Sequence, residues 1–275
     1  MINIDKILVK IELLIKEDTE SSLTYAALEA RLALEKICYD RLRQAHDYIS
    51  HDQLSRWQPN AVMNTLITHV DKNAAKTMTL RISKNPAVEG IEPVEEDFVD
   101  IGTQVGFDSN KIRDFWNALS RVALHAKLPT NKDDHIPPYG DKAKIKNKVL
   151  QVVKEIKRIS KTTMVFSGFG DEVSFECHCG EKNKRRAELL KENDEVYCIN
   201  PSCQWSWIVE KDDNEVGFKP NTVEIECDNC SKAMIIPWRK CLQLKYGTRL
   251  RLSCHNCKSE RDLVWALGTV PLKDK

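Results

Sequence analysis

The segments Val173-Ser-Phe-Glu-Cys177 and Val223-Glu-Ile-Glu-Cys227 open two copies of one pattern in the C-terminal part of this 275-residue chain. In each segment apolar and polar residues alternate, which is typical of a β-strand, and the strand leads directly into a cysteine. The eight cysteines of the two copies are Cys177, Cys179, Cys198 and Cys203, then Cys227, Cys230, Cys254 and Cys257. Two repeated four-cysteine units therefore decide the fold of this region.

Four thiolates form the closed tetrahedral shell of a structural zinc site, with no open position for a catalytic water. In the second copy, two residues separate the cysteines of each pair and 23 residues separate the pairs, a spacing slightly longer than the usual zinc pattern that still indicates a zinc site. In the first copy, His178 alone separates Cys177 from Cys179, and four residues separate Cys198 from Cys203. We predict two zinc ribbons with one structural Zn²⁺ each.

Disulfides are the alternative use of paired cysteines. The chain begins Met1-Ile-Asn-Ile-Asp-Lys6 without a basic run, apolar segment and cleavage site, so we expect a cytoplasmic protein with reduced thiols. His178 alternates with the neighbouring cysteines, and we expect it at the surface rather than on a metal. Cys38 and Cys241 lie outside the pattern in apolar, helix-like surroundings, so we expect both to be buried.

The N-terminal half has the periodicity of amphipathic helices. It predicts helices over residues 4–15, 23–50, 60–70 and 109–127, with a loop over 84–95. Residues 129–141 contain three prolines and are predicted to be a linker. Residues 142–161 form a basic helix whose apolar side consists of Ile145, Val149, Val152, Ile156 and Ile159.

The predicted fold class is α+β with several domains. An all-α helical bundle occupies residues 1–128, and the linker and basic helix occupy 129–170. The two β zinc ribbons occupy 171–218 and 219–275. No apolar run approaches the roughly 18 residues of a membrane helix, so we expect no membrane partner.

Positive charge is concentrated in residues 142–161, which hold eight Lys or Arg and one acid, while the whole chain has a net charge of +1. Cations give salt-dependent affinity for phosphate, and exposed aromatic rings stack on unpaired bases. The tryptophans near the cysteines are Trp205, Trp207, Trp238 and Trp265, which alternatively fill the ribbon cores. The candidate nucleic-acid ligands are Lys144, Lys148, Lys154, Lys157, Arg158, Arg185, Arg186 and Arg239. A helix-turn-helix that begins with a helix over residues 99–106 is a second arrangement for DNA or RNA binding.

The run Tyr25-Ala-Ala-Leu-Glu-Ala-Arg31-Leu-Ala-Leu-Glu35, followed later by Leu119-Ser-Arg-Val-Ala-Leu-His125, resembles bacterial HEPN-type helical domains. The resemblance covers residues 1–128 and implies that a helix with an Arg-x-x-x-Glu signature packs on a helix with an Arg and a His. It implies a metal-independent ribonuclease of phage-defence or toxin systems, or a non-catalytic helical module. It also implies a homodimer in which two facing motifs form the cleft. Arg31 and Glu35 also have the spacing of a one-turn salt bridge.

Two Arg/His pairs compete for the site that the resemblance implies. Arg41 and His46 have the family's usual spacing, but five helical steps place them about 140° apart. Arg121 and His125 are one residue closer than that spacing, yet four steps bring them within about 40° of one another, and Asn117 lies one turn earlier on the same face. Helix geometry favours Asn117, Arg121 and His125, whereas motif length favours Arg41 and His46.

RNA cleavage needs a base for the ribose 2′-hydroxyl and a cation for the phosphate, roles that suit His and Arg. The sequence therefore predicts a nucleic-acid-binding protein that acts on RNA, with ribonuclease activity in a defence or toxin setting. The alternative is a non-enzymatic scaffold whose ribbons bind another protein.

Overall fold

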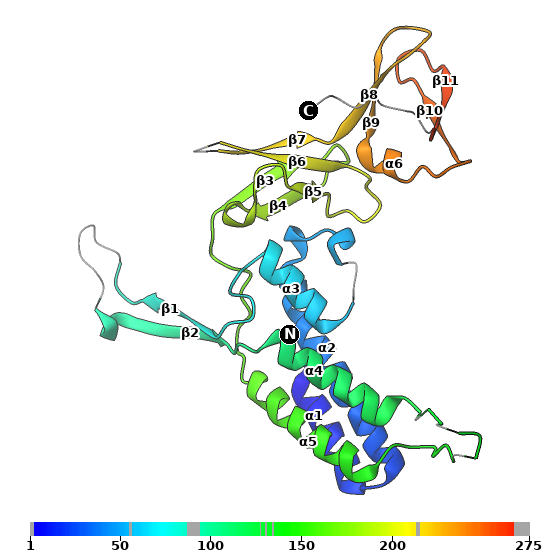
Figure 1. Ribbon diagram of the computed structural model, residues 1–275. Helices are drawn as coiled ribbons and strands as arrows, with labels where there is room; N and C mark the ends of the chain where they lie inside the picture. The colour runs from blue at the N-terminus through cyan, green and yellow to red at the C-terminus, as the bar shows by residue number, and fades with distance from the viewer. Residues whose placement is uncertain are drawn as a thin grey trace, which may run out of the picture. The chain divides into compact units, whose positions relative to one another are not determined.

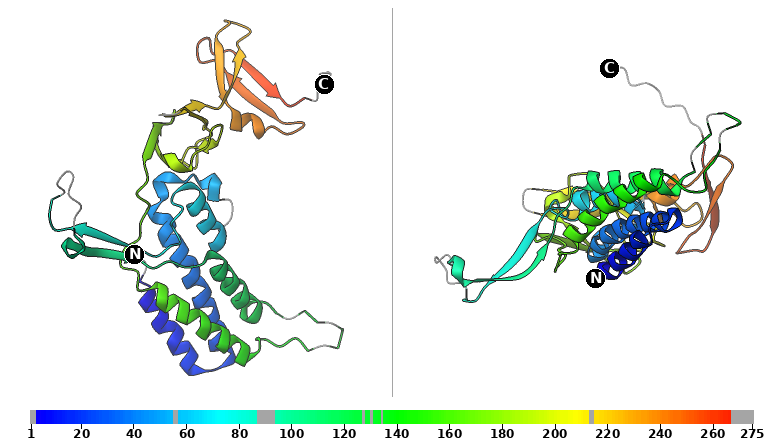
Figure 2. Two further views of the ribbon diagram at one scale, coloured as in Figure 1. Left: turned by 60° about the vertical axis from the view of Figure 1, so that its left-hand side comes forward. Right: turned by 90° about the horizontal axis from the view of Figure 1, so that it is seen from below.

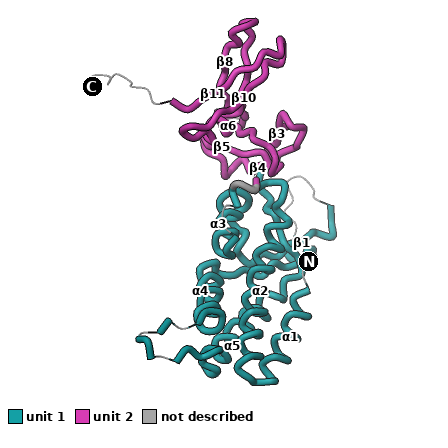
Figure 3. The backbone as a smooth tube through the Cα atoms, turned by 90° about the vertical axis from the view of Figure 1, so that its right-hand side faces the viewer, with its two compact units in different colours: residues 1–49, 53–171 teal, residues 50–52, 172–275 magenta. Residues whose placement is uncertain are grey.

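The computed structural model describes residues 3–54, 57–86, 94–126, 128–129, 131–133, 135–212 and 215–266. The chain divides into two compact units, residues 1–49 with 53–171 and residues 50–52 with 172–275 (Figure 3). The first unit is helical apart from one hairpin, and the second consists mainly of short antiparallel strands, so the fold is of the mixed α+β class. No helix among these residues is both long and apolar enough to span a membrane.

A helical bundle makes up most of the first unit (Figure 1). Its helices are α1 (Ile4–Glu17), α2 (Glu20–Gln44), α3 (Pro59–His69), α4 (Ser109–Leu119) and α5 (Lys142–Ile159). The predicted helices over 4–15, 60–70 and 142–161 are confirmed to within two residues at each end. Thr19 and Ser22 form a capping box that starts α2 directly after α1 ends, so the polar residues between them make a tight connection.

Helix α5 belongs to the bundle core. The five apolar residues predicted for its inner side are all buried, and the helix packs against α2. The bundle therefore extends beyond residue 128, because the apolar side of α5 completes the core that α1 and α2 begin. Residues 135–141, which were predicted to belong to a linker, lead back to the start of α5 within the same unit.

Two predicted helices are shorter than expected. Helix α2 ends at Gln44 and a 3₁₀ turn follows at His46–Tyr48, so the predicted extension to residue 50 is wrong. Helix α4 ends at Leu119 and continues as a π-helical turn over Ser120–Leu124. The Ser120 hydroxyl donates a 2.9 Å hydrogen bond to the Trp116 carbonyl at this transition. Lys127, the predicted end of the helix, lies outside the described residues.

A β-hairpin takes the place of the first helix of the helix-turn-helix considered for residues 99–127. Strands β1 (Met78–Ser83) and β2 (Phe98–Gln104) pair antiparallel, with Ile82 opposite Val99, and the hairpin projects away from the helices (Figures 1 and 2). The helix over 99–106 is therefore wrong, because Val99, Ile101 and Thr103 are β-branched residues that favour a strand. Part of the predicted loop over 84–95 lies outside the described residues.

In the second unit the sequence repeat appears as two hairpins, each with a pair of cysteines in the turn between its strands. In the first copy, β3 (Glu172–Glu176) pairs with β4 (Lys182–Arg186), and in the second, β8 (Thr222–Glu226) pairs with β9 (Ala233–Pro237). The first copy adds a three-stranded sheet of β5 (Glu195–Tyr197), β6 (Ser206–Lys211) and β7 (Val216–Pro220). The second adds the short helix α6 (Trp238–Leu242) and a hairpin of β10 (Arg249–Ser253) and β11 (Glu260–Val264).

The two copies differ in the size of their apolar cores. The first core contains Leu190, Val196, Trp207 and Val209 beside three buried cysteines, with Phe175 and Phe218 packed against it. Among the described residues, the second core contains Met234 beside two buried cysteines, with Ile225 packed against it. The stability of the second copy therefore depends more heavily on a link between its cysteines than on apolar packing.

Candidate metal centres and candidate active site

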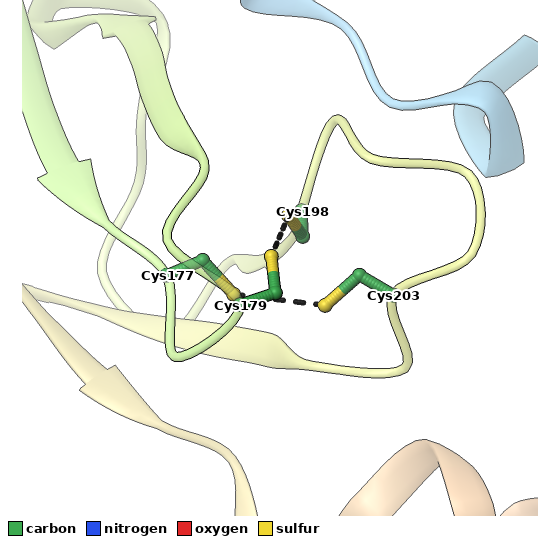
Figure 4. Close-up of side chains that lie close together, drawn as sticks. All are labelled: Cys177, Cys179, Cys198 and Cys203. Atoms are coloured by element: carbon green, nitrogen blue, oxygen red, sulfur yellow. Dashed lines mark hydrogen bonds between the residues drawn. The ribbon is translucent and has the colours of Figure 1, made fainter.

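The first four-cysteine cluster lies between the turn after β3 and the loop before β6. Its sulfurs point toward one another (Figure 4), with 3.7 Å between Cys177 and Cys203 and 3.6 Å between Cys179 and Cys198. Gly180 follows the second cysteine with a φ of +86°, which glycine adopts without strain, and its N–H donates to the Cys177 carbonyl. This tight turn lets two cysteines only one residue apart share a cluster.

The second cluster joins two equivalent turns. Cys227 and Cys257 have sulfurs 3.6 Å apart, and Cys230 and Cys254 have sulfurs 3.7 Å apart. In both turns the residue after the second cysteine has a positive φ, 53° at Ser231 and 64° at Lys258. The N–H of that residue donates to the carbonyl of the first cysteine. The repeated turn explains why a two-residue gap recurs in both pairs.

Each cluster could hold one metal ion, since all four sulfurs of a cluster lie within 4.8 Å of one another. A tetrahedron with zinc–sulfur bonds of about 2.3 Å has sulfurs about 3.8 Å apart, close to the distances in both clusters. A disulfide would need about 2.05 Å, so the cysteines of these pairs are not bonded to each other. The donor set and its spacing therefore fit a four-coordinate ion with soft ligands.

Side chains behind the sulfurs support each cluster. In the first, the fully buried Asn183 directs its amide nitrogen to Cys198 Sγ at 3.8 Å and accepts a 2.9 Å hydrogen bond from the Ile199 N–H. In the second, the Ser259 hydroxyl lies 3.2 Å from Cys227 Sγ and 3.1 Å from Cys257 Sγ. This hydroxyl is the main reason that the pKa of Cys257 falls to about 5. Such contacts orient thiolates toward a common ion.

The other cysteines and His178 lie outside the clusters. His178 is exposed as predicted, with its ring centre 4.1 Å from that of Trp205. Cys38 is buried as predicted, and burial raises the pKa of its thiol to about 12. Cys241 is only half-buried, so its predicted burial is wrong, because the five-residue helix α6 leaves even Leu242 exposed.

The tryptophans near the cysteines divide between core and surface. Trp207 is buried against Phe175, with ring centres 5.1 Å apart, and Trp205 is half-buried. Trp238 and Trp265 are 40% and 46% exposed. Only the last two present much of their rings to a partner.

Three arginines predicted to contact nucleic acid make internal contacts in the second unit. Arg185 is buried and donates to the Lys184 and Tyr197 carbonyls at 2.7 and 2.5 Å. Arg186 is also buried and lies 4.0 Å from Glu172. Arg239 lies over the Tyr197 ring and donates to the Cys203 carbonyl at 3.3 Å. These contacts stabilise the ribbon fold. Because Arg185 and Arg186 are buried, their guanidinium groups are not accessible to a phosphate.

The cations of α5 are partly matched by acids of the same unit. Lys157 pairs with Glu12 at 2.5 Å, Arg158 with Glu155 at 2.6 Å and Lys144 with Asp141 at 3.7 Å. Arg158 and then Lys111 hold the pKa of Glu155 below its usual value. Lys154 is exposed at the surface, and Lys148 lines a cavity in the first unit.

That cavity, of about 910 Å³, brings together residues from four parts of the first unit. Its lining includes the predicted set Asn117, Arg121 and His125, all exposed, although the π-helical turn interrupts the regular helix on which the prediction rested. Sequence reasoning missed the further lining residues Trp57 and Phe115, and it did not place Arg31 or the candidate nucleic-acid ligand Lys148 in the same cavity. Trp57, which lies two residues before Pro59, carries no periodic signal, so only the fold brings it to this cavity.

The turn that carries Arg121 is held by a close backbone contact. A Cβ atom at Gly140 would lie 2.1 Å from the Val122 carbonyl oxygen, so only glycine allows the chain to pass there. On the other side, Trp116 donates from Nε1 to Glu35 at 2.7 Å, and Glu35 lies 3.6 Å from Arg31. The predicted Arg31–Glu35 salt bridge is confirmed, and α2 packs on the segment that carries Arg121 and His125.

The alternative pair is arranged differently. Arg41 is buried and donates to the carbonyls of Ala74 and Val105, the second at 2.7 Å, with its guanidinium 4.4 Å from the centre of the Phe107 ring. Burial lowers its pKa to about 10, so it stays charged at neutral pH. His46 lies beyond the end of α2 and is exposed. Neither residue lines the cavity that holds Arg121 and His125.

Comparisons with known proteins assign no relative. No protein-family model, curated protein or solved structure shows a significant match to the chain. The inferences below therefore rest on the residues and their arrangement.

Proposed function

We propose that the protein binds RNA at the cavity of the first unit and cleaves it there without a catalytic metal. The observation that carries the proposal is the joint lining of this cavity by Asn117, Arg121 and His125 with Arg31 and Lys148. Three cations can bind phosphate, and a histidine can exchange protons near neutral pH. The arrangement agrees with the resemblance to HEPN-type ribonucleases, which also suggests a homodimer and a role in phage defence or a toxin system.

The chemistry is transfer of the scissile phosphate to the neighbouring 2′-oxygen. Neutral His125 takes the proton of the 2′-hydroxyl, the 2′-oxygen bonds to phosphorus, and the bond to the 5′-oxygen breaks. The leaving oxygen takes a proton from water, and the products are a 2′,3′-cyclic phosphate and a 5′-hydroxyl. Arg121 stabilises the charge that grows on the phosphate, and Asn117 can donate a hydrogen bond to it.

The donors around the cavity favour this metal-free chemistry. Among the described residues that line it, Asp114 is the only acid, and it pairs with Arg113 at 3.0 Å. Paired carboxylates that would hold two divalent cations are therefore not provided by this lining. The two four-cysteine clusters hold structural Zn²⁺ in this proposal and take no part in the reaction, because four thiolates close the coordination shell.

Cleavage of total RNA by zinc-loaded protein in a buffer without added divalent cations tests the catalytic part. We expect His125→Ala to lower the rate by about 10²- to 10⁴-fold. His135→Ala, a change at an exposed histidine that does not line the cavity, should leave the rate unchanged. Loss of activity with His46→Ala instead would assign the reaction to Arg41 and His46. Full activity in both variants would overturn catalysis at either site.

Binding is tested separately from cleavage. Affinity of the His125→Ala variant for a single-stranded RNA should fall steeply as salt rises, since phosphate contacts release counterions. Arg121→Ala should weaken binding and reduce this salt dependence. No binding at low salt would overturn the RNA-binding part of the proposal.

A non-enzymatic scaffold is the second candidate, and the surface of the second ribbon favours it. Ile235, Leu242 and Tyr246 are 56%, 62% and 87% exposed, which is much apolar surface for so small a unit. In that case the ribbons bind a protein partner. This function would be supported if the wild type is inactive towards RNA and if Leu242→Ser abolishes binding of a protein partner that the wild type binds.

A further inference from the structure

One side of the cavity in the first unit is aromatic. Trp57, Phe115 and Trp116 line it beside the polar residues of the proposed RNA site. Trp116 is buried, whereas Trp57 remains 58% exposed even though it contacts Trp116. An exposed tryptophan at the edge of a cationic cavity has a free surface on which a flat ligand can stack.

The Trp57 ring rests on a fixed support. Its centre lies 5.5 Å from that of Trp116, with the rings inclined by 69°, an edge-to-face contact that fixes its tilt. Trp116 is itself held by its hydrogen bond to Glu35 and by the Arg31 guanidinium, 4.0 Å from its ring centre. The backbone carbonyl of Trp57 accepts a hydrogen bond from the Tyr39 hydroxyl. A ring held from behind loses little further freedom when a ligand stacks on it.

The charges around the cavity select the kind of ligand. Arg31, Arg121 and Lys148 line it, while its only described acid, Asp114, is paired with Arg113. A cationic ligand would be repelled, although aromatic rings can bind cations elsewhere. A ligand with both a flat ring and an anionic group satisfies both parts of the lining. The cavity volume of about 910 Å³ is also ample for a nucleotide.

We propose that Trp57 is the stacking platform of a nucleotide subsite, on which one unpaired base lies while its phosphate contacts Arg121 and Lys148. This inference rests on the proposed RNA site and adds how a base is held there. Stacking is tolerant of sequence, because every base has a π-face, so the subsite requires an unpaired base and not a particular one. Double-stranded RNA, whose bases are already stacked, cannot use it.

Ligands with and without a base test the subsite directly. We expect the full-length protein to bind adenosine 5′-monophosphate about 5- to 100-fold more tightly than ribose 5-phosphate, as measured by isothermal titration calorimetry. Trp57→Ala should remove most of that preference by weakening only the nucleotide, and Trp57→Phe should keep part of it. Arg121→Ala should weaken both ligands by a similar factor. Trp265→Ala, a change at another exposed tryptophan, should alter neither affinity.

Three results would overturn the subsite. They are equal affinity of the wild type for the two ligands, no binding of either ligand, and equal weakening of both ligands by Trp57→Ala and Trp57→Phe. The last result would mean that Trp57 only supports the cavity wall. A nucleotide preference that depends on Trp57, combined with no binding or cleavage of RNA, would leave a mononucleotide site and overturn only the proposed function. Failure of the two proposals can thus be told apart.

Discussion

At the second four-cysteine cluster, one hydroxyl contacts two of the four sulfurs. Ser259 holds the pKa of Cys257 at about 5 and that of Cys227 below its usual value. A thiol with a lowered pKa stays a thiolate as pH falls, and metals bind the thiolate. The hydroxyl should therefore help this cluster to keep a bound metal ion in mild acid.

Ser259→Ala should weaken metal binding at this centre by about tenfold or more, as measured by competition with a chromophoric chelator. Since the change raises the pKa of the thiols, protons should displace the metal at a higher pH than in the wild type. Ser253→Ala, in the same hairpin but without a sulfur contact among the described residues, should behave like the wild type. An unchanged acid-release midpoint for Ser259→Ala would show that the hydroxyl does not tune the thiolates.

Arg41 shows how a residue with a formal motif spacing can have a structural role. Arg41→Met should destabilise the first unit by about 2–4 kcal/mol, because one buried and one partly buried carbonyl lose a charged donor. Urea denaturation followed by helical circular dichroism measures this. Arg43→Met on the same helix, at a side chain that is 57% exposed, should have little effect. Normal stability combined with lost RNA cleavage in Arg41→Met would instead favour the pair Arg41 and His46.

The residues that the sequence predicted best are those whose spacing alone fixes their contacts. Both cysteine clusters lie within short turns and hairpins, so the intervals between cysteines determine which sulfurs meet. The cavity residues depend on tertiary packing, since Trp57, Phe115 and Lys148 come from segments far apart in the chain. Helical spacing suggested that Asn117, Arg121 and His125 lie together, but it could not show the π-helical turn that carries Arg121 and ends just before His125.

Among the elements, helix α5 differs most from its predicted place in the organisation of the first unit. Its charge suggested a surface helix that joins two halves, yet its apolar side fills the bundle core. Ile156→Ala should therefore destabilise the first unit by about 2–5 kcal/mol, measured by chemical denaturation. Leu150→Ala on the same helix, where the side chain is 47% exposed, should cost much less. Similar small effects for both changes would mean that α5 acts as a linker.

The β1–β2 hairpin was missed for a physical reason. A strand buried on one face alternates between apolar and polar residues, but β1 and most of β2 have no fully buried residue on either face. Ile82 and Val99 pair across the strands while both remain exposed. Because most of β2 has no buried face, apolar residues do not alternate with polar residues along it. Only the β-branched residues of β2 indicated a strand.

The whole chain contains separate cores with different origins of stability. The first unit has one large apolar core shared by its helices, whereas each ribbon core includes its own cysteines. A structural zinc site contributes on the order of 10 kcal/mol or more, comparable to the stability of a small domain. Removal of metal should thus affect the two units unequally.

Treatment of the full-length protein with chelator and reductant should open the second unit to proteolysis while the first stays folded. Mass spectrometry of the fragments should find early cleavage within residues 172–266 and protection of the α1, α2 and α5 helices. The second ribbon should be cut before the first, because Met234 is the only non-cysteine residue buried in its described core. Added Zn²⁺ should restore resistance. Equal digestion of both units, or no change with chelator, would contradict the view that metal stabilises only the ribbons.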